Sequence, residues 1–251
     1  MTDAFRSDRR RAIGALAASA AMLSGCVARA DTPPATPSPI PPPHPPGPPG
    51  KHEPKPLPFD AAKLRGLSEK LVVSHHDNNY VGAVKNLNRV EEELARVTKD
   101  TPPFVVGGLQ ERALTFRNSA TLHEHYFANL GGDGKISGAI ERVIADAFGS
   151  SARWEELFRA TAMALAGGSG WVVLAHDLHR DAPVIGWSGG HTQIVALGAP
   201  LLVLDMYEHA FALDYGAAAA KYVDAFFANV QWDEVSRRHE RARRAAAALR
   251  G

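Results

Sequence analysis

The chain has 251 residues, 45% of them hydrophobic, and its formal net charge at pH 7 is +1. A charge so near zero argues against nucleic acid as a partner, because nucleic-acid-binding domains are usually strongly basic. The N-terminal part differs in composition from the remainder, which at about 190 residues suits one compact domain or two small, tightly packed ones.

Residues 1–30 have the features of an export signal. Three consecutive arginines precede an apolar run from Ala12 to Leu23, which is too short and too rich in alanine and glycine for a good membrane-spanning helix. The arginines resemble a twin-arginine signal. The sequence "LSGC" resembles a bacterial lipobox, which implies that Cys26 is acylated and becomes the mature N-terminus. The alternatives are ordinary cleavage after Ala30 and an uncleaved hydrophobic anchor.

We therefore expect an exported, periplasmic lipoprotein that meets the membrane only through its N-terminal lipid. Cys26 is the only cysteine, so the folded part has no internal disulfide and no cysteine-ligated zinc or iron–sulfur site. Residues 31–58 contain 14 prolines and too little apolar surface to fold, which predicts an extended polyproline tether. A ligand for an SH3-type domain is the alternative interpretation of this segment.

Residues 59–132 are predicted to form a helical hairpin. Apolar residues at three- and four-residue spacing predict one helix over residues 60–97, with Asp60 as its N-cap. The sequence "KDTPPF" ends this pattern. A second helix is predicted over residues 109–130, where "GGDG" stops it.

Residues 133–251 are predicted to form an α/β domain. Three short segments rich in β-branched and apolar residues are separated by turn residues, which predicts a small antiparallel sheet. The predicted strands are 171–177, 183–189 and 200–207, and the predicted helices are 137–148, 151–166, 217–227 and 233–249. The expected fold class is α+β, with the N-terminal helical hairpin packed on a C-terminal domain whose three-stranded antiparallel sheet is surrounded by helices.

Possible metal ligands lie in three separate segments. "SHHDNNY" is in the first helix, "LHEHYF" is in the second, and "LDMYEHAF" follows the third strand. Three neutral imidazoles and one carboxylate suit a divalent or trivalent first-row metal. The candidates are His75 or His76, His123 or His125, and the pair Asp205 and His209.

The motif "DMYEH" at residues 205–209 resembles the D-x-W-E-H motif of the iron/manganese superoxide dismutase family, with Tyr207 in place of the tryptophan. "NLGGDG", "AFGS", "GSGWVVL" and "YVDAFFANVQW" occur in the family's order and extend the resemblance over about residues 57–235. The resemblance implies one iron or manganese ion per subunit. It also implies that superoxide is converted to dioxygen and hydrogen peroxide by one-electron cycling of this ion.

The resemblance also assigns the ligands within each histidine pair. "HEHYFANL" fits the family's H-x-x-F-W-x-x-L with His123 as the ligand, so that His125 faces away. Aligning "VKNLN" with the family's V-N-N-L-N places His75 at the other ligand position, whereas anchoring on Tyr80 would place Val72 there and leave no metal site. The implied ligands are His75, His123, Asp205 and His209.

Other implied residues surround the metal. His191, in "SGGHTQ", is expected to hydrogen-bond the metal-bound solvent. Asn79 and Ala83 stand where the family has its gateway histidine and tyrosine, and Tyr80 is expected to take over part of that role. Ala218 stands where many members have an anion-attracting arginine, so we expect altered steering of the substrate. The implied surroundings also include Trp171, Tyr207 and Phe127.

The resemblance implies a homodimer, because Glu208 would bond His209 of a partner subunit across a two-fold axis. The rival function is a tethered metal-binding protein of the same fold with weak or lost catalysis. A third is a metal-dependent oxygenase or hydrolase with two histidines and one carboxylate, which a four-ligand set disfavours. The sequence does not distinguish iron from manganese, since both use the same ligands.

Overall fold

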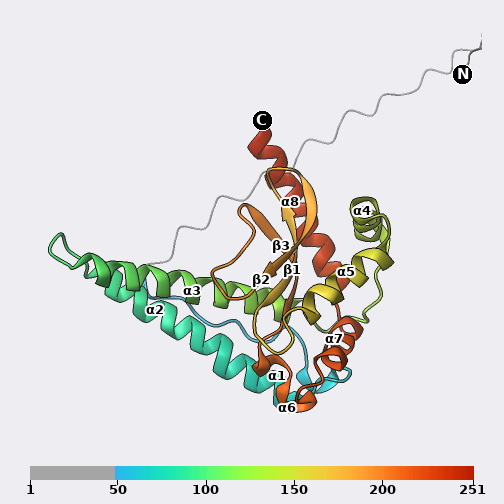
Figure 1. Cartoon of the computed structure of the whole chain (residues 1–251), viewed down its shortest axis with the longest axis horizontal. Coiled ribbons are helices and arrows are strands. Elements are labelled where there is room, and N and C mark those ends of the chain that lie inside the picture. The colour runs from blue at the N-terminus through green and yellow to red at the C-terminus, as the bar shows by residue number, and fades with distance from the viewer. Residues whose placement is uncertain (1–48) are drawn as a thin grey trace, which may run out of the picture. The chain divides into compact units, whose positions relative to one another are not determined.

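The computed structural model describes residues 49–251 of the chain (Figure 1). The predicted export signal, with Cys26, and most of the predicted tether lie outside the described residues. Within the described part of the chain, no helix is both long enough and apolar enough to cross a membrane.

A long antiparallel pair of helices forms one arm of the molecule (Figure 1). It consists of α2 (Val81–Ala95) and α3 (Pro103–Ala128), which pack side by side. The prediction started the second helix at residue 109, but α3 begins at Pro103. Proline is well suited to the first position of a helix, because its missing N–H would have no partner there and its φ angle already fits.

The single helix predicted over residues 60–97 is wrong, because the chain is interrupted near Gly66, whose φ angle is +74°. Asp60 caps only a short 3₁₀ turn, accepting a hydrogen bond from the Ala62 N–H. The helix α1 (Glu69–Ser74) starts afresh at Ser68, whose hydroxyl accepts from the main-chain N–H of Leu71. The Ser68 cap replaces the predicted one.

A π-helical segment, His75–Tyr80, joins α1 to α2. The wider turn of a π-helix changes the direction in which successive side chains point, and such segments are frequent at functional sites. The whole of "HHDNNY" adopts this conformation. The histidine doublet therefore lies where the helix departs from its regular period.

The sheet confirms the predicted three antiparallel strands. They are β1 (Trp171–Asp177), β2 (Ala182–Ser188) and β3 (Gly198–Asp205), in the order β2-β1-β3. The central strand β1 is buried along its whole length. Its first residue, Trp171, pairs with Asp205, the last residue of β3. The α+β fold class is thus confirmed.

The remaining helices surround the sheet (Figure 1). They are α4 (Gly138–Phe148), α5 (Ser151–Met163), α6 (Ala212–Tyr215), α7 (Ala219–Ala228) and α8 (Trp232–Arg250). One continuous hydrophobic core contains residues from α1, α3, β3 and α7, represented by Leu71, Tyr126, Leu202 and Phe226. The helical hairpin and the sheet region are therefore joined through a shared core.

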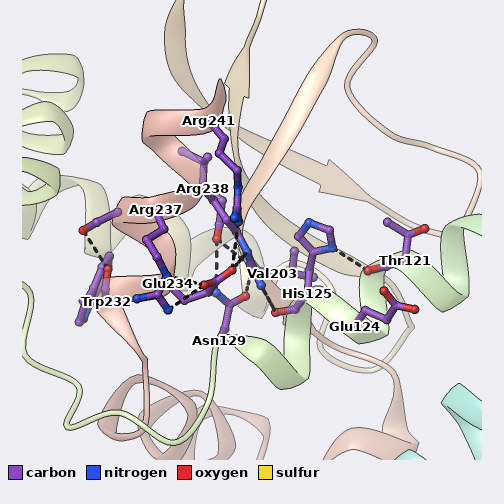
Figure 2. Close-up of polar contacts among 12 residues, drawn as sticks. Thr121, Glu124, His125, Asn129, Val203, Trp232, Glu234, Arg237, Arg238 and Arg241 are labelled. Atoms are coloured by element: carbon purple, nitrogen blue, oxygen red, sulfur yellow. Dashed lines mark hydrogen bonds and ion pairs between the residues drawn. The ribbon is translucent and has the colours of Figure 1, made fainter. Parts of the chain in front are cut away.

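Arg238 of α8 is buried, with 6% of its surface exposed. Its guanidinium donates to the main-chain oxygens of Leu201 (3.0 Å) and His125 (3.3 Å), and to the carboxylate of Glu234 (2.9 Å). Figure 2 shows Arg238 extending from α8 toward His125, with Glu234 beside it. One side chain thus connects α8 to α3 and β3.

Replacing Arg238 with methionine should lower the free energy of unfolding by about 2 kcal/mol, because the carbonyls of Leu201 and His125 and the Glu234 carboxylate each lose one charged donor. Urea denaturation of the full chain measures this. Arg244→Met is the matched control on the exposed face of α8 and should change stability by less than about 0.5 kcal/mol. Equal effects in the two variants would contradict the role of Arg238.

Residues 50–58, which we call the strap, run in an extended conformation against the helical hairpin. The side-chain amide of Asn88 holds the strap by both main-chain groups of His52: its oxygen accepts from the His52 N–H (2.8 Å), and its NH₂ donates to the His52 carbonyl (2.9 Å). This two-sided contact satisfies backbone groups that secondary structure does not.

Glu91 is the second holder of the strap. Its carboxylate accepts hydrogen bonds from the Gly50 N–H (3.1 Å), the His52 imidazole (2.8 Å) and Arg117 (3.0 Å). Partial burial favours the neutral acid, but these donors outweigh it and hold the pKa of Glu91 below its ordinary value of 4.5. The ionised carboxylate is therefore the form that holds the strap.

Acid should loosen the strap, because a group with a lowered pKa stabilises the fold above its ordinary pKa and stops doing so as the pH falls through the lowered value. We expect the NMR amide signal of Gly50, which donates to Glu91, to move toward its free-peptide position as the pH drops below about 4.5. In Glu91→Ala it should already lie there at neutral pH. A Gly50 signal that stays fixed until the protein unfolds would refute this.

Candidate metal centre

Four side chains from separate parts of the sequence converge at one point. His75 begins the π-helical segment, His123 lies on α3, Asp205 ends β3, and His209 lies in the 3₁₀ turn Glu208–Ala210. One potential ligand atom from each lies within 4.8 Å of all the others. The first three residues are buried and His209 is partly exposed, so the cluster sits at the inner end of an opening.

The hydrogen bonding of His123 shows what the cluster is built to hold. Its Nδ1 donates to the main-chain oxygen of Ser119 (2.7 Å), so Nε2 carries a lone pair. That Nε2 is buried, has no hydrogen-bond partner, and faces Oδ2 of Asp205 at 3.6 Å. Two electron pairs that face one another in a buried place favour a cation between them.

The other two imidazoles face the same carboxylate oxygen. Nε2 of His75 lies 3.1 Å from Oδ2 of Asp205, and Nε2 of His209 lies 3.3 Å from it. The donor set is therefore three imidazole nitrogens and one carboxylate, which fits a first-row transition metal such as iron or manganese.

The ionisation of these groups also fits a metal. Burial lowers the pKa of His75, and burial together with the neighbouring His75 lowers the pKa of His123 to about 3. Burial alone would raise the pKa of Asp205, but hydrogen bonds from His209 and His75 outweigh it and bring the pKa well below its ordinary value. Neutral imidazoles and an ionised carboxylate are the forms that bind metal.

The structure separates the two members of each histidine pair. Nε2 of His76 donates to the main-chain oxygen of Lys55 (2.8 Å), and Nδ1 of His125 donates to that of Thr121 (2.8 Å). Neither belongs to the cluster. Val72, which would be the ligand if the alignment were anchored on Tyr80, lies in the hydrophobic core. The four residues brought together are those that the resemblance implied.

An aromatic layer lies against the cluster. The indole N–H of Trp171 donates to Nδ1 of His191 (3.0 Å), which leaves the proton of a neutral His191 on Nε2. The His191 ring stacks on Tyr207 with 4.8 Å between centroids, and Tyr207 stacks on His209 at 5.3 Å. Phe127 meets the His75 ring edge-on at 5.0 Å. These contacts fix the ring orientations around the cluster.

A funnel of about 230 Å³ leads to the cluster. His123, His191 and His209 line its inner part, and Asn79 and Ala83, which the alignment placed at the gateway, line its walls. Two further asparagines, Asn78 and Asn86, also line it, and no lysine or arginine is among its described lining residues. The path to the cluster is thus polar and mostly neutral.

Tyr80 does not lie in this funnel, which corrects the expectation that it shares the gateway role. Its hydroxyl accepts from the Lys55 N–H (2.8 Å) and donates to Glu124 (3.1 Å), and only 1% of the residue is exposed. Burial raises its pKa to about 12. Tyr80 and Asn79 are adjacent, so their side chains point to different sides of the helix, and only Asn79 lines the funnel.

Two features of the site were missed in the sequence. Ser119 lies four residues before His123, so its main-chain oxygen receives the imidazole N–H across one helical turn; this spacing was a usable signal. The contact of Lys55 with Tyr80 joins residues 25 apart and left no signal in the sequence. Glu208 is exposed, and the single chain contains no partner subunit that would test its expected contact.

Comparison with known proteins identifies relatives of the whole folded part. Residues 136–238 match the family model for iron/manganese superoxide dismutases, C-terminal domain. An iron superoxide dismutase of Cupriavidus metallidurans is 47% identical over 74% of this chain and 95% of its own length. A manganese superoxide dismutase of Halobacterium salinarum is 35% identical over 76% of this chain and 96% of its own. An iron enzyme of Aquifex pyrophilus is 32% identical over 74% and 91%.

Proposed function

The chain belongs to the iron/manganese superoxide dismutase family, and we propose that His75, His123, Asp205 and His209 hold its iron or manganese ion. Its function is to convert two superoxide anions and two protons into dioxygen and hydrogen peroxide. The observation that carries the ligand proposal is the unpartnered Nε2 of His123, which faces the Asp205 carboxylate.

When bound, a redox-active ion exchanges one electron at a time with superoxide. The protein's own contribution is to fix the donor set. Ser119 holds the imidazole of His123 in the tautomer whose Nε2 points into the cluster. Asp205 supplies a negative charge that favours the higher oxidation state, and the neutral imidazoles keep the lower state accessible.

His191 is proposed as a hydrogen-bond donor to solvent or substrate in the funnel. Its Nδ1 accepts from the Trp171 indole, so in the neutral ring the N–H at Nε2 remains available. Burial lowers the pKa of His191 and favours this neutral ring. Asn79 and the other wall amides can also donate hydrogen bonds to superoxide.

The substrate reaches the cluster past neutral side chains. Neither Ala83 nor Ala218 provides the tyrosine or arginine of the family pattern, and no described lysine or arginine lines the funnel. Electrostatic guidance of superoxide is correspondingly weak. We propose that this chain is a slower dismutase than members that retain those residues, with the catalytically weak metal-binding protein as the alternative.

Assembly and location also remain proposals. A homodimer is supported by the exposure of Glu208 at the surface beside the partly exposed His209, where a second subunit could contact both. Export is supported by the arginines and the apolar run of residues 1–30. We propose a periplasmic protein, tethered through Cys26 or released by cleavage after Ala30.

Superoxide turnover by the full chain loaded with iron or manganese tests the proposed function. His123→Ala should lose the ion and lower kcat/KM by more than about 100-fold, since even residues that merely orient metal ligands are worth 10–100-fold. His179→Ala is the matched control, because His179 is exposed and outside the cluster. Full metal content and full turnover in His123→Ala would refute the site. A wild-type protein that binds the metal but does not turn over superoxide would favour the catalytically weak metal-binding protein.

The dimer proposal is tested separately by sedimentation. Replacing Glu208 with alanine should raise the Kd of the dimer by about 30-fold or more, because the imidazole of His209 on the other subunit would lose the carboxylate that accepts its hydrogen bond at the interface. Glu240→Ala, a change on the exposed face of α8, should leave the Kd unchanged. A monomeric wild type, or equal Kd values for both variants, would exclude this interface.

A further inference from the structure

A single residue of the strap, Lys55, touches both segments that carry the proposed buried histidine ligands. Its main-chain N–H donates to the Tyr80 hydroxyl (2.8 Å), and its main-chain oxygen accepts from Nε2 of His76 (2.8 Å). Its ammonium pairs with the carboxylate of Glu124. Three polar groups of one residue therefore have three different partners on the hairpin.

Two of these partners adjoin proposed ligands in the sequence. His76 follows His75 in the π-helical segment, and Glu124 follows His123 on α3. The Tyr80 hydroxyl donates to the same Glu124 (3.1 Å). The strap, the π-helical segment and α3 are thus closed into one hydrogen-bonded ring behind the metal cluster.

The contacts differ in how far they are shielded from water. Tyr80 is 1% exposed and its bond to the Lys55 N–H is part-buried, so an unpaired hydroxyl at this position would be costly. The Lys55 ammonium is largely exposed, so its pairing with Glu124 contributes less. The hydroxyl of Tyr80, which bonds both Lys55 and Glu124, therefore contributes most to holding these segments together.

A pocket of about 120 Å³ lies between the strap and the hairpin, and Pro56, Pro58, Tyr80 and Phe127 are among the residues that line it. The surfaces on either side of this pocket lack dispersion contacts with one another, although Leu57 of the strap packs against the hydrophobic core. The hydrogen bonds of Lys55 therefore add to the packing of Leu57 in fixing the strap.

Phe127 provides the path from this ring to the metal cluster. Its centroid lies 5.4 Å from the His76 ring, 6.2 Å from Tyr80 and 5.0 Å from His75. A shift of the strap or of Tyr80 would therefore displace the His75 imidazole, because Phe127 packs against both.

We propose that the strap is a positioning element of the metal centre and that Tyr80 is its main positioning residue. The hydrogen bonds among the strap, the π-helical segment and α3 fix the distance between the last two. They therefore determine how firmly His75 and His123 retain the ion. The π-helical segment departs from the regular α-helical ladder of hydrogen bonds, so contacts from outside the helix help to fix it. This proposal rests on the proposed ligand set.

The test uses the full chain loaded with iron. Tyr80→Phe keeps the aromatic side chain and removes both hydrogen bonds of the hydroxyl. We expect it to release iron to a chelator about tenfold faster than the wild type, the lower end of the effect of residues that orient metal ligands. We also expect a changed electron paramagnetic resonance spectrum of the ferric protein, because the ligand field senses the position of His75.

Matched variants of the strap sharpen the test. Lys55→Met should speed iron release by a smaller factor, and Lys55→Arg should restore the wild-type rate by renewing the pair with Glu124. Lys51→Met, an exposed strap position, is the control and should behave as the wild type.

Wild-type release rates and spectra in both Tyr80→Phe and Lys55→Met would overturn the proposal. So would a lower Tm of Tyr80→Phe with an unchanged release rate and spectrum, because that pattern belongs to a residue that supports the fold alone. Failure of the wild type itself to bind iron would instead refute the ligand set, so the two proposals fail in distinguishable ways.

Discussion

The structure depends on a buried carboxylate that three imidazoles surround. Oδ2 of Asp205 has Nε2 of His75, His209 and His123 at 3.1, 3.3 and 3.6 Å. Without a cation, this arrangement would leave a lone pair of His123 facing a negative oxygen in the interior, which is strongly unfavourable. A metal ion turns the same four donors into a stabilising set, so ion binding and the stability of this region are linked.

The remainder of the fold holds these donors at the ends of rigid elements. Asp205 ends a strand paired with the fully buried β1, and His123 lies on a long helix that α8 secures through Arg238. His75 is different, because it begins a π-helical segment. It is the donor that gains most from outside support, and the strap contacts the segment through His76 and Tyr80.

Much of this could be predicted from the sequence. The strands and most helices were found because their signals, period and turn residues, are local. Asp205 and His209 lie in one short motif, whereas His75 and His123 were assigned within their histidine pairs by resemblance to the family. The failures have physical causes. Gly66 interrupts an otherwise regular leucine pattern, Pro103 starts a helix where proline usually suggests a break, and nothing local marks the π-helical segment. The contacts of Tyr80 and Lys55 join residues distant in sequence.

We propose that one redox-active ion lies among His75, His123, Asp205 and His209. A crystal structure of the full chain purified with its native metal tests this, with anomalous diffraction recorded at the iron and manganese absorption edges. We expect one anomalous peak per chain, within bonding distance of the three Nε2 atoms and the Asp205 carboxylate. An anomalous peak elsewhere in the molecule would contradict this proposal. So would protein that turns over superoxide but shows the four side chains ordered with no peak between them.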